Sequence, residues 1–387
     1  MPKQQRLILA LFCLTLAISL PVWSASTGFR NDGSGLYPGA RPPLHWSAQS
    51  NVLWKAALTN GSNASPILSG RNLFVCAEPA TLICLSAETG AILWSDTLPD
   101  LPNPPPRTHP VTGYTSPTPC TDGQHVWATF GQGLAACWTI KGKRLWTRKL
   151  ENPPHEWGGC ISPRLAGGVL VVQFDRMRGL DPLTGNEKWN LQTPWGWGTP
   201  VVATIAGRDL LYTCKGAIVD AASGRELGRG LPSLEYNSPC LVNNTLYYLQ
   251  GNPQAFSLPD TPEGSPVPLW SNARIAGDRY YGTPVVHKGL VYAINQAKNL
   301  SVLEQATGKL IYEKKVDFLQ GTVYPSPTLA GEYVFLSSEN GQTVVIKTGP
   351  EYAEVSRNSL EPFRSCPVFS GKRMFIRGNR NLWCIEQ

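Results

Sequence analysis

Hydrophobic residues in this chain occur in short runs that are separated by glycine, asparagine or proline. Examples are Leu73-Phe74-Val75, Val169-Leu170-Val171-Val172 and Tyr333-Val334-Phe335-Leu336. β-Branched and aromatic residues dominate these runs, and short apolar runs bounded by turn residues favour buried strands. The pattern therefore predicts an all-β chain of many short strands.

A unit that begins with Ser-Pro or Thr-Pro recurs along the chain. Its starts are Ser65-Pro66, Ser116-Pro117, Ser162-Pro163, Thr199-Pro200, Ser238-Pro239, Thr283-Pro284 and Ser326-Pro327, with a degenerate eighth at Cys366-Pro367. A turn residue follows five positions after several of the starts, at Gly70, Gly167, Asn243, Gly331 and Gly371. The interval of 37 to 51 residues between starts suits four short strands per propeller blade.

The second half of the unit has a Thr-Gly or Ser-Gly turn, and an aromatic residue follows the glycine by four positions. The clearest copies span residues 87–94, 181–189 and 304–312, and weaker copies span 141–146 and 221–227. We expect this aromatic position to lie on an outer strand and to pack against the scaffold. The tryptophans assigned this structural docking role are Trp54, Trp94, Trp146, Trp189 and Trp270.

These elements resemble the repeat of PQQ-like β-propellers with its tryptophan-docking motif, over residues 44–387. The resemblance implies a single eight-bladed propeller of four-stranded antiparallel blades. The last unit ends at Trp383-Cys384-Ile385 without its outer strand, and an orphan copy of that strand spans residues 51–58. We therefore expect the N-terminal strand to complete the last blade, which would remove exposed sheet edges.

The N-terminus predicts export to the periplasm or the cell surface. Lys3 and Arg6 precede an apolar run over residues 7–20, and small residues follow at positions 24–26. Residues 1–25 are assigned to a signal peptide, and an uncleaved anchor is the alternative. Cys13 lies inside the apolar run, which argues against a lipid-attachment site. Residues 26–43 are rich in glycine and proline, and we expect them to wrap the surface.

Composition excludes several classes of function. The chain has 42% hydrophobic and 16% charged residues, which fits a packed core. Its net charge is +7, but no basic run is long enough for nucleic-acid binding, and no later segment is apolar enough to span a membrane. Nine of the ten cysteines follow the signal peptide and none has a zinc or haem spacing. Two alternatives remain for the cysteines: Cys76 and Cys84 form a disulfide across one hairpin, or most of the cysteines are buried free thiols.

Aromatic residues cluster just before most of the Ser/Thr-Pro starts, where they should converge at one mouth of the central channel. This candidate ligand-binding mouth comprises Tyr114, Trp157, Trp195, Trp197, Tyr236, Tyr280, Tyr281, Tyr324 and Phe363. The rings could stack on sugars, peptide aromatics or a planar cofactor, or they could simply seal the channel. The run Trp195-Gly196-Trp197-Gly198 is the most unusual part of this set.

A proline-rich insertion over residues 98–115 precedes the second blade and carries Arg107 and His109. Such a segment cannot pair as a central strand, because proline lacks the backbone donor. It either caps one face and docks a partner, or it is an extended surface loop.

The sequence assigns no catalytic residue, no metal ligand and no cofactor. The resemblance to quinoprotein dehydrogenases would imply adjacent cysteines and a calcium site of Glu, Asn and Asp, but no two cysteines are adjacent. The five histidines show no metal-ligand spacing. The chain looks more like the non-catalytic BamB-type propellers, and residues 108–123 resemble the secreted propellers of planctomycete-like bacteria. The leading hypothesis is a scaffold that binds a protein in the cell envelope. The alternatives are a glycan or peptide binder and a quinoprotein-like oxidoreductase.

Overall fold

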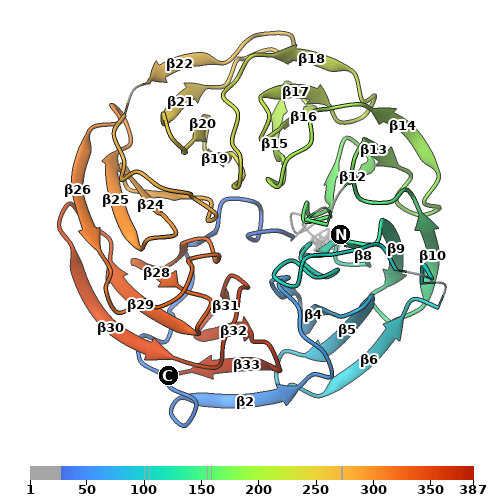
Figure 1. Ribbon diagram of the computed structural model, residues 1–387, viewed down its shortest axis with the longest axis horizontal. Coiled ribbons are helices and arrows are strands. Elements are labelled where there is room, and N and C mark those ends of the chain that lie inside the picture. The colour runs from blue at the N-terminus through green and yellow to red at the C-terminus, as the bar shows by residue number, and fades with distance from the viewer. Residues whose placement is uncertain (1–27, 100, 104, 155, 158, 272) are drawn as a thin grey trace, which may run out of the picture.

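The computed structural model describes residues 28–387, except residues 100, 104, 155, 158 and 272. The assigned signal peptide lies outside the described residues. Eight antiparallel blades form a closed ring around a central channel (Figure 1). The predicted all-β, eight-bladed propeller is confirmed.

The first four blades follow one another along the chain, and each strand pairs with the next. Blade 1 has β3 (Ile67–Ser69), β4 (Asn72–Ala77), β5 (Thr81–Ser86) and β6 (Ile92–Thr97). Blade 2 has β7 (Cys120–Thr121), β8 (His125–Phe130), β9 (Leu134–Thr139) and β10 (Arg144–Lys149). Blade 3 has β11 (Arg164–Ala166), β12 (Val169–Gln173), β13 (Met177–Leu180) and β14 (Glu187–Leu191). Blade 4 has β15 (Val201–Ile205), β16 (Arg208–Tyr212), β17 (Ala217–Asp220) and β18 (Glu226–Arg229).

The other four blades continue the ring. Blade 5 has β19 (Cys240–Val242), β20 (Thr245–Tyr248), β21 (Gln254–Ser257) and β22 (Val267–Trp270). Blade 6 has β23 (Val285–His287), β24 (Leu290–Ile294), β25 (Asn299–Glu304) and β26 (Leu310–Lys315). Blade 7 has β27 (Thr328–Ala330), β28 (Tyr333–Ser337), β29 (Gln342–Lys347) and β30 (Ala353–Ser359). Blade 8 has β31 (Val368–Ser370), β32 (Arg373–Arg377) and β33 (Asn381–Glu386), and β2 (Val52–Ala57) is its outer strand.

The ring closes where β2 pairs with β33, as the orphan strand predicted. Trp54 lies opposite Cys384 in this antiparallel pair, and a bulge directly precedes the tryptophan. The same irregularity precedes the aromatic position of the other docking strands, such as Trp94 opposite Cys84. A bulge turns the following side chain relative to the ladder. Here it brings each indole toward the neighbouring blade.

All five docking tryptophans bind the next blade around the ring. Each indole nitrogen donates to a backbone carbonyl oxygen there, at 2.8 to 3.4 Å. Each indole also covers the glycine of that blade's last turn, where an added Cβ would lie 2.5 to 2.7 Å from the ring. The covered glycines are Gly90, Gly142, Gly185, Gly224 and Gly308. Their positive φ and this close approach explain why glycine recurs at this turn.

The Ser/Thr-Pro starts form a hydrogen-bonded belt around the channel, in which one blade's backbone N–H donates to the hydroxyl of the next. The belt residues are Ser65, Thr118, Ser162, Thr199, Ser238, Thr283, Ser326 and Cys366. The donor–acceptor distances in these seven bonds are 2.8 to 3.2 Å. All eight belt residues are buried. Cysteine replaces the hydroxyl in blade 8.

The belt corrects the predicted start of blade 2 from Ser116-Pro117 to Thr118-Pro119. The N–H of Ser65 donates to Thr118 Oγ1 at 3.1 Å. Gly123, with φ of 89°, lies five residues after Thr118, which restores the spacing seen in other blades. Consecutive Ser-Pro and Thr-Pro pairs offer two possible starts, and only the register distinguishes them.

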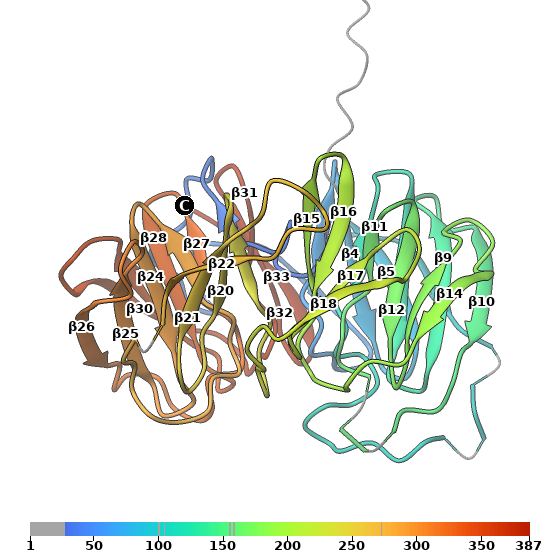
Figure 2. The same ribbon diagram turned by 90° about the horizontal axis from the view of Figure 1, so that it is seen from above.

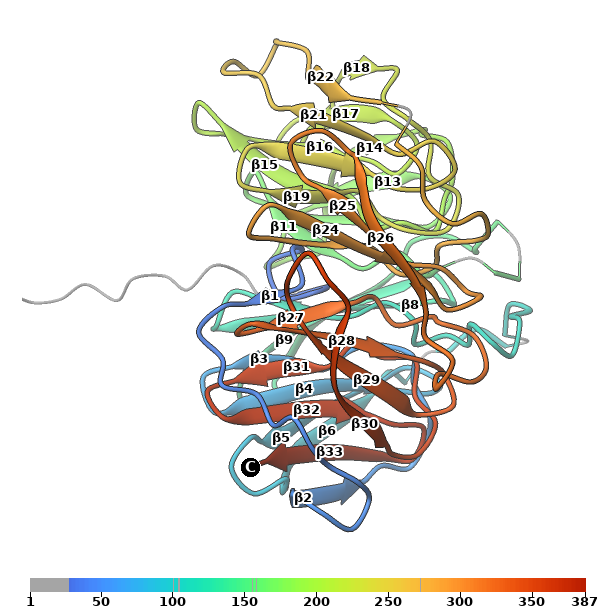
Figure 3. The same ribbon diagram turned by 90° about the vertical axis from the view of Figure 1, so that its left-hand side faces the viewer.

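The N-terminal segment enters the channel, whereas the sequence suggested a surface wrap. Its strand β1 (Leu36–Tyr37) pairs in parallel with β27 at the inner edge of blade 7 (Figure 3). Arg30 is buried and donates to the carbonyl oxygens of Thr283 and Pro284 in blade 6. On the other side of the channel, the side chain of Arg164 in blade 3 donates to Asp32 O at 3.0 Å. Backbone carbonyl groups and side-chain packing both hold this segment, since Tyr37 packs edge-on against Phe369 of blade 8 with ring centroids 5.4 Å apart.

The nine described cysteines are free thiols, and all except Cys160 are buried. Cys84 lies opposite Phe74, and Cys76 lies opposite Leu82, so the two sulfurs are not directly paired across the hairpin. Burial raises the pKa of the Cys76 thiol to about 12. The alternative of buried free thiols is therefore the one observed. Within the described part of the chain, no helix has the length and apolar character needed to cross a membrane.

Candidate functional site

A cavity of about 910 Å³ occupies the central channel. Phe29 of the N-terminal segment lines it, and so do belt residues from seven different blades. These belt residues are Ser65, Thr118, Thr199, Ser238, Thr283, Ser326 and Cys366. The remaining lining residues come from connections that lead from an outer strand to the next inner strand. A cavity of this size is typical of small-molecule or peptide sites.

One position in each connection faces the cavity, two residues before the belt residue. The residues at this position are Asn63, Ser116, Cys160, Trp197, Tyr236, Tyr281, Tyr324 and Arg364, and all of them line the cavity. Extended backbone sends neighbouring side chains to opposite sides. The residue three positions before the belt should therefore point away from the cavity.

This alternation explains two aromatic residues that do not reach the mouth. Tyr280 and Phe363 each lie three positions before the belt, and each is 1% exposed. The hydroxyl of Tyr280 donates to Ala276 O at 2.8 Å, and Phe363 packs in the core between blades 7 and 8. The sequence placed both at the channel mouth, but they stabilise the scaffold instead.

The other predicted aromatic residues divide into lining and supporting groups. Trp157, Trp197, Tyr236, Tyr281 and Tyr324 line the cavity. Trp195 packs edge-on against Trp197 at 4.4 Å and supports it from outside the lining. Tyr114 supports the proline-rich insertion, because its hydroxyl donates to Pro106 O at 2.7 Å.

Four of the lining rings form a continuous aromatic arc, which consists of Trp197, Tyr236, Tyr281 and Tyr324. The ring centroids of neighbours are 5.5, 5.2 and 4.9 Å apart, with interplanar angles of 35°, 63° and 38°. Such edge-to-face and tilted contacts hold the rings in place. The arc spans the connections that lead into blades 4 to 7.

The opposite wall is polar, and the proline-rich insertion contributes to it. Asn63 Nδ2 donates to the carbonyl oxygens of Val111 and Thr112 at 2.6 and 2.9 Å. Arg107 forms an ion pair with Glu156 at 2.9 Å, and all five of these residues line the cavity. Figure 2 shows the insertion, in cyan, extending from one face of the ring. It caps the polar side of the mouth rather than lying on the outer rim.

Two more arginines lie against the aromatic arc. Arg279 stacks over Tyr236 at 5.4 Å and donates to the hydroxyl of Tyr281 at 3.4 Å. Arg364 lies over Tyr324 at 5.3 Å and forms an ion pair with Glu339 at 2.9 Å. Burial alone would raise the pKa of Glu339, but hydrogen bonds from Arg364 and Thr322 outweigh it and lower that pKa.

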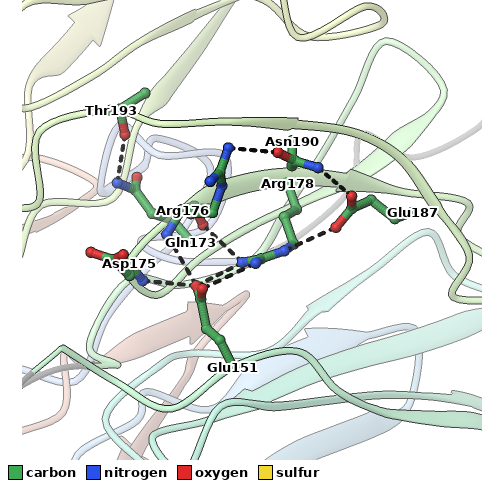
Figure 4. A network of polar contacts seen from close by, with 8 residues as sticks. All are labelled: Glu151, Gln173, Asp175, Arg176, Arg178, Glu187, Asn190 and Thr193. Carbon is green, nitrogen blue, oxygen red and sulfur yellow. Dashed lines mark hydrogen bonds and ion pairs between the residues drawn. The ribbon is translucent and has the colours of Figure 1, made fainter.

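Half-buried glutamate side chains position the connections that carry the site. In Figure 4, Glu151 accepts hydrogen bonds from the backbone N–H groups of Asp175 and Arg176 at 2.9 and 3.0 Å. Arg178 clamps the same carboxylate with two bonds at 2.6 and 3.0 Å, and also contacts Glu187. This network fixes the start of the connection that carries Glu156 and Trp157.

The same device recurs beside other blades. Glu78 accepts from the N–H groups of Tyr114 and Thr115, and Gln250 accepts from the N–H of Tyr236. Burial raises the pKa of Glu78 despite these hydrogen bonds. A side-chain oxygen thus accepts hydrogen bonds from backbone N–H groups and holds several of the lining connections in place.

The residues present do not fit the cofactor set of quinoprotein dehydrogenases. Cys160 and Cys366 line the cavity but come from different blades, so no adjacent pair is available. Among the residues that the structure describes, no group of three His, Cys, Asp or Glu side chains could hold a metal ion.

Comparison with protein families gives a match along nearly the whole propeller. The model described as outer membrane protein assembly factor BamB matches residues 46–260, 104–309 and 192–387. The chain belongs to the BamB-like family of PQQ-like propellers. Overlapping matches along the chain are expected for a family of repeats.

Solved structures share the fold of this BamB-like propeller. BamB from Moraxella catarrhalis is 15% identical, with a TM-score of 0.63, and the match covers 86% of this chain and 96% of that one. The quinohemoprotein alcohol dehydrogenase of Comamonas testosteroni is 11% identical, with a TM-score of 0.63 and 87% and 76% coverage. The C-terminal WD40 domain of Sif2 is 11% identical, with a TM-score of 0.62 and 87% and 99% coverage. Curated protein sequences gave no match.

Sequence reasoning missed the charged and polar lining residues. Asn63 and Arg364 occupy the position two before the belt, so alignment of the starts could have revealed them. Arg279 directly precedes the Tyr280-Tyr281 pair, but its contact with Tyr236 in the previous connection depends on tertiary packing. No sequence pattern pointed to Phe29, because its segment lies outside the repeat and has no predicted position relative to the channel.

Proposed function

We propose that this protein is a non-catalytic binding scaffold of the bacterial cell envelope, and that its central cavity receives part of a partner protein. Family membership supports the scaffold role, since the matching family is described as an outer-membrane protein assembly factor. The observation that carries the proposal is the concave lining at the channel mouth, where the aromatic arc faces a polar wall. Aromatic residues and arginines are the side chains most enriched at the energetic centres of protein interfaces.

The rigidity of the cavity also supports binding. Seven belt bonds, the ring contacts of the arc and the hydrogen bonds accepted by half-buried glutamates fix the lining before any ligand arrives. A preformed site loses less conformational entropy on association than a flexible one. The predicted signal peptide would deliver the scaffold to the envelope.

The proposal is tested by photo-crosslinking in envelope extracts of the bacterium that produces the chain. The photoreactive residue replaces Tyr281 in the cavity or, as a control, Leu183, which is 55% exposed outside it. We expect one discrete protein adduct at position 281, none at position 183, and loss of the adduct when Trp197→Ala is added. Equal adducts at both positions, or an adduct that persists in Trp197→Ala, would reject the cavity as the site.

A second candidate is a quinoprotein-like oxidoreductase, which the alcohol dehydrogenase neighbour brings into consideration. Titration with pyrroloquinoline quinone and calcium distinguishes the oxidoreductase from the scaffold. Tryptophan fluorescence reports quinone binding, and dye-linked alcohol oxidation reports turnover. We expect no saturable quenching and no oxidation. Stoichiometric quinone binding with turnover would replace the scaffold proposal.

A further inference from the structure

The cavity has an uneven distribution of charge. Arg107, Arg279, Arg364 and Glu156 are its charged lining residues, so positive groups are in excess. Glu156 neutralises Arg107, and Glu339, which lies behind the lining, neutralises Arg364. Among the described residues, no carboxylate forms an ion pair with Arg279, and the charge of Glu235 acts on it only from a longer distance. Arg279 is therefore the charge that a ligand can complement.

Arg279 is held in place although it is exposed. Its guanidinium stacks on Tyr236 and donates to the Tyr281 hydroxyl, so two members of the arc restrict its position. Restricting a long side chain in advance reduces the entropy lost when it binds an anion. A guanidinium also presents several N–H donors that match a carboxylate.

The packing of the arc argues against sugar rings as the ligand. A sugar binds by lying flat on an open aromatic face, but Arg279 covers one face of Tyr236 and Arg364 covers one face of Tyr324. Trp195 also packs against Trp197, and Tyr236 packs edge-on against Tyr281. Aromatic edges carry partial positive charge, so edges and guanidinium groups together favour an anionic ligand.

We propose that the aromatic arc and Arg279 form a binding site for an acidic peptide segment, in which a carboxylate pairs with Arg279 and a neighbouring apolar side chain packs on the arc. This inference rests on the proposed function and names the chemistry of the partner. Phe29 lies in the lining, and residues 28–37 occupy the channel behind it. Because residues 28–37 fill the channel, the acidic peptide segment of the partner enters the mouth as a loop tip or a chain end and does not thread through the ring.

The test measures binding of defined probes to the chain without its signal peptide, by isothermal titration at 50 and 500 mM NaCl. The peptide probes are the capped hexapeptide Ala-Phe-Glu-Phe-Glu-Ala and its neutral counterpart with Gln in place of Glu. The saccharide probe is tetragalacturonate. The variant is Arg279→Gln, and the matched control is Arg274→Gln, an exposed arginine of the same connection that does not line the cavity.

We expect the acidic peptide to bind roughly five- to tenfold more tightly than the neutral one at low salt, as suits one partly screened ion pair. Arg279→Gln should abolish this preference, Arg274→Gln should retain it, and high salt should reduce it. Equal affinity for both peptides, or tighter binding of tetragalacturonate, would overturn the inference. Absence of binding to every probe would also overturn it, while a Trp197-dependent crosslink at position 281 would leave the proposed function standing.

Discussion

The indole nitrogen of Trp54 donates a 3.4 Å hydrogen bond to the carbonyl oxygen of Ala87, and its ring covers Gly90 in the same turn. Trp54 belongs to the strand that completes blade 8, whereas Ala87 and Gly90 belong to blade 1. This single side chain therefore spans the junction at which the ring closes.

Trp54→Ala should lower the free energy of unfolding by about 2–3 kcal/mol, somewhat less than a fully buried tryptophan, because it removes a large, partly buried aromatic side chain from a packed junction. Thermal and urea denaturation measure the change. Leu53→Ala is the matched control, since its neighbouring side chain is 47% exposed, and it should change stability by no more than about 0.5 kcal/mol. An unchanged melting temperature in Trp54→Ala would contradict the closure model.

Thr118→Val keeps the shape of the side chain but removes the hydroxyl that accepts from the Ser65 N–H. A buried backbone donor left without a partner costs about 1–3 kcal/mol, so the variant should be destabilised by that amount. Ser116→Ala, at the start that the sequence favoured, should have a smaller effect. Urea denaturation measures both variants. A larger loss of unfolding free energy in Ser116→Ala than in Thr118→Val would place the start of blade 2 at Ser116-Pro117 instead.

Tyr280 and Tyr281 are adjacent but should respond differently to removal of the hydroxyl. Tyr280→Phe leaves Ala276 O without its donor in the core and should cost about 1 kcal/mol of stability with no change in ligand binding. Tyr281→Phe removes the contact to Arg279 at the mouth and should weaken binding of the acidic hexapeptide with little change in stability. Melting temperature and titration distinguish the pair, and the reverse pattern would refute the alternation around the belt.

Acid should weaken the network around Glu151. Burial alone would raise the pKa of Glu151, but hydrogen bonds and charge from Arg178 and the N–H groups of Arg176 and Asp175 lower it below its usual value of 4.5. A carboxyl with a lowered pKa in the folded state stabilises the protein above its unfolded pKa, and this stability is lost as pH falls through the folded pKa.

The free energy of unfolding should therefore decline below about pH 4.5 more steeply in the native chain than in Glu151→Gln. Denaturation at a series of pH values measures both slopes. Glu351→Gln, which changes an exposed carboxylate in a turn, should keep the native slope. Equal slopes in Glu151→Gln and the native chain would show that Glu151 does not contribute to the acid sensitivity.

The described cysteines should remain unreactive in the folded protein. Burial raises the pKa of thiols such as Cys76 and Cys384 to about 12, so little thiolate is available for reaction. A thiol reagent should label almost none of the nine sites under native conditions and all nine after unfolding without reductant. Fewer than nine labels after unfolding would indicate disulfides that the structure lacks.

The repeat made the fold predictable, because most blades carry a turn glycine and many carry a docking aromatic residue. The covered glycines and the bulges before the tryptophans explain why these positions recur. Blade 2 was misplaced by two residues because Ser116-Pro117 and Thr118-Pro119 fit the same pattern locally. Only pairing with the neighbouring blade fixes the register there.

The site was predictable in part for the same reason. Counting from the belt separates Tyr281 and Tyr324, which line the cavity, from Tyr280 and Phe363, which do not. Proximity to a Ser/Thr-Pro start does not show whether a residue lies an even or an odd number of positions before the belt, so it cannot separate the two groups. The roles of Arg279 and Phe29 depend on contacts between distant segments, and no local pattern carries that information.

The pairing of β2 with β33 also governs when the cavity can exist. Strand β2 is made early, but its native neighbour is β33, the last strand of the described residues, so β2 stays unpaired until β33 is made. Until then both end blades are open at the junction, and unpaired strands of this kind are prone to aggregation. An unfinished or truncated chain therefore presents exposed edges and an incomplete mouth. Binding by this propeller is therefore coupled to the synthesis and docking of β33.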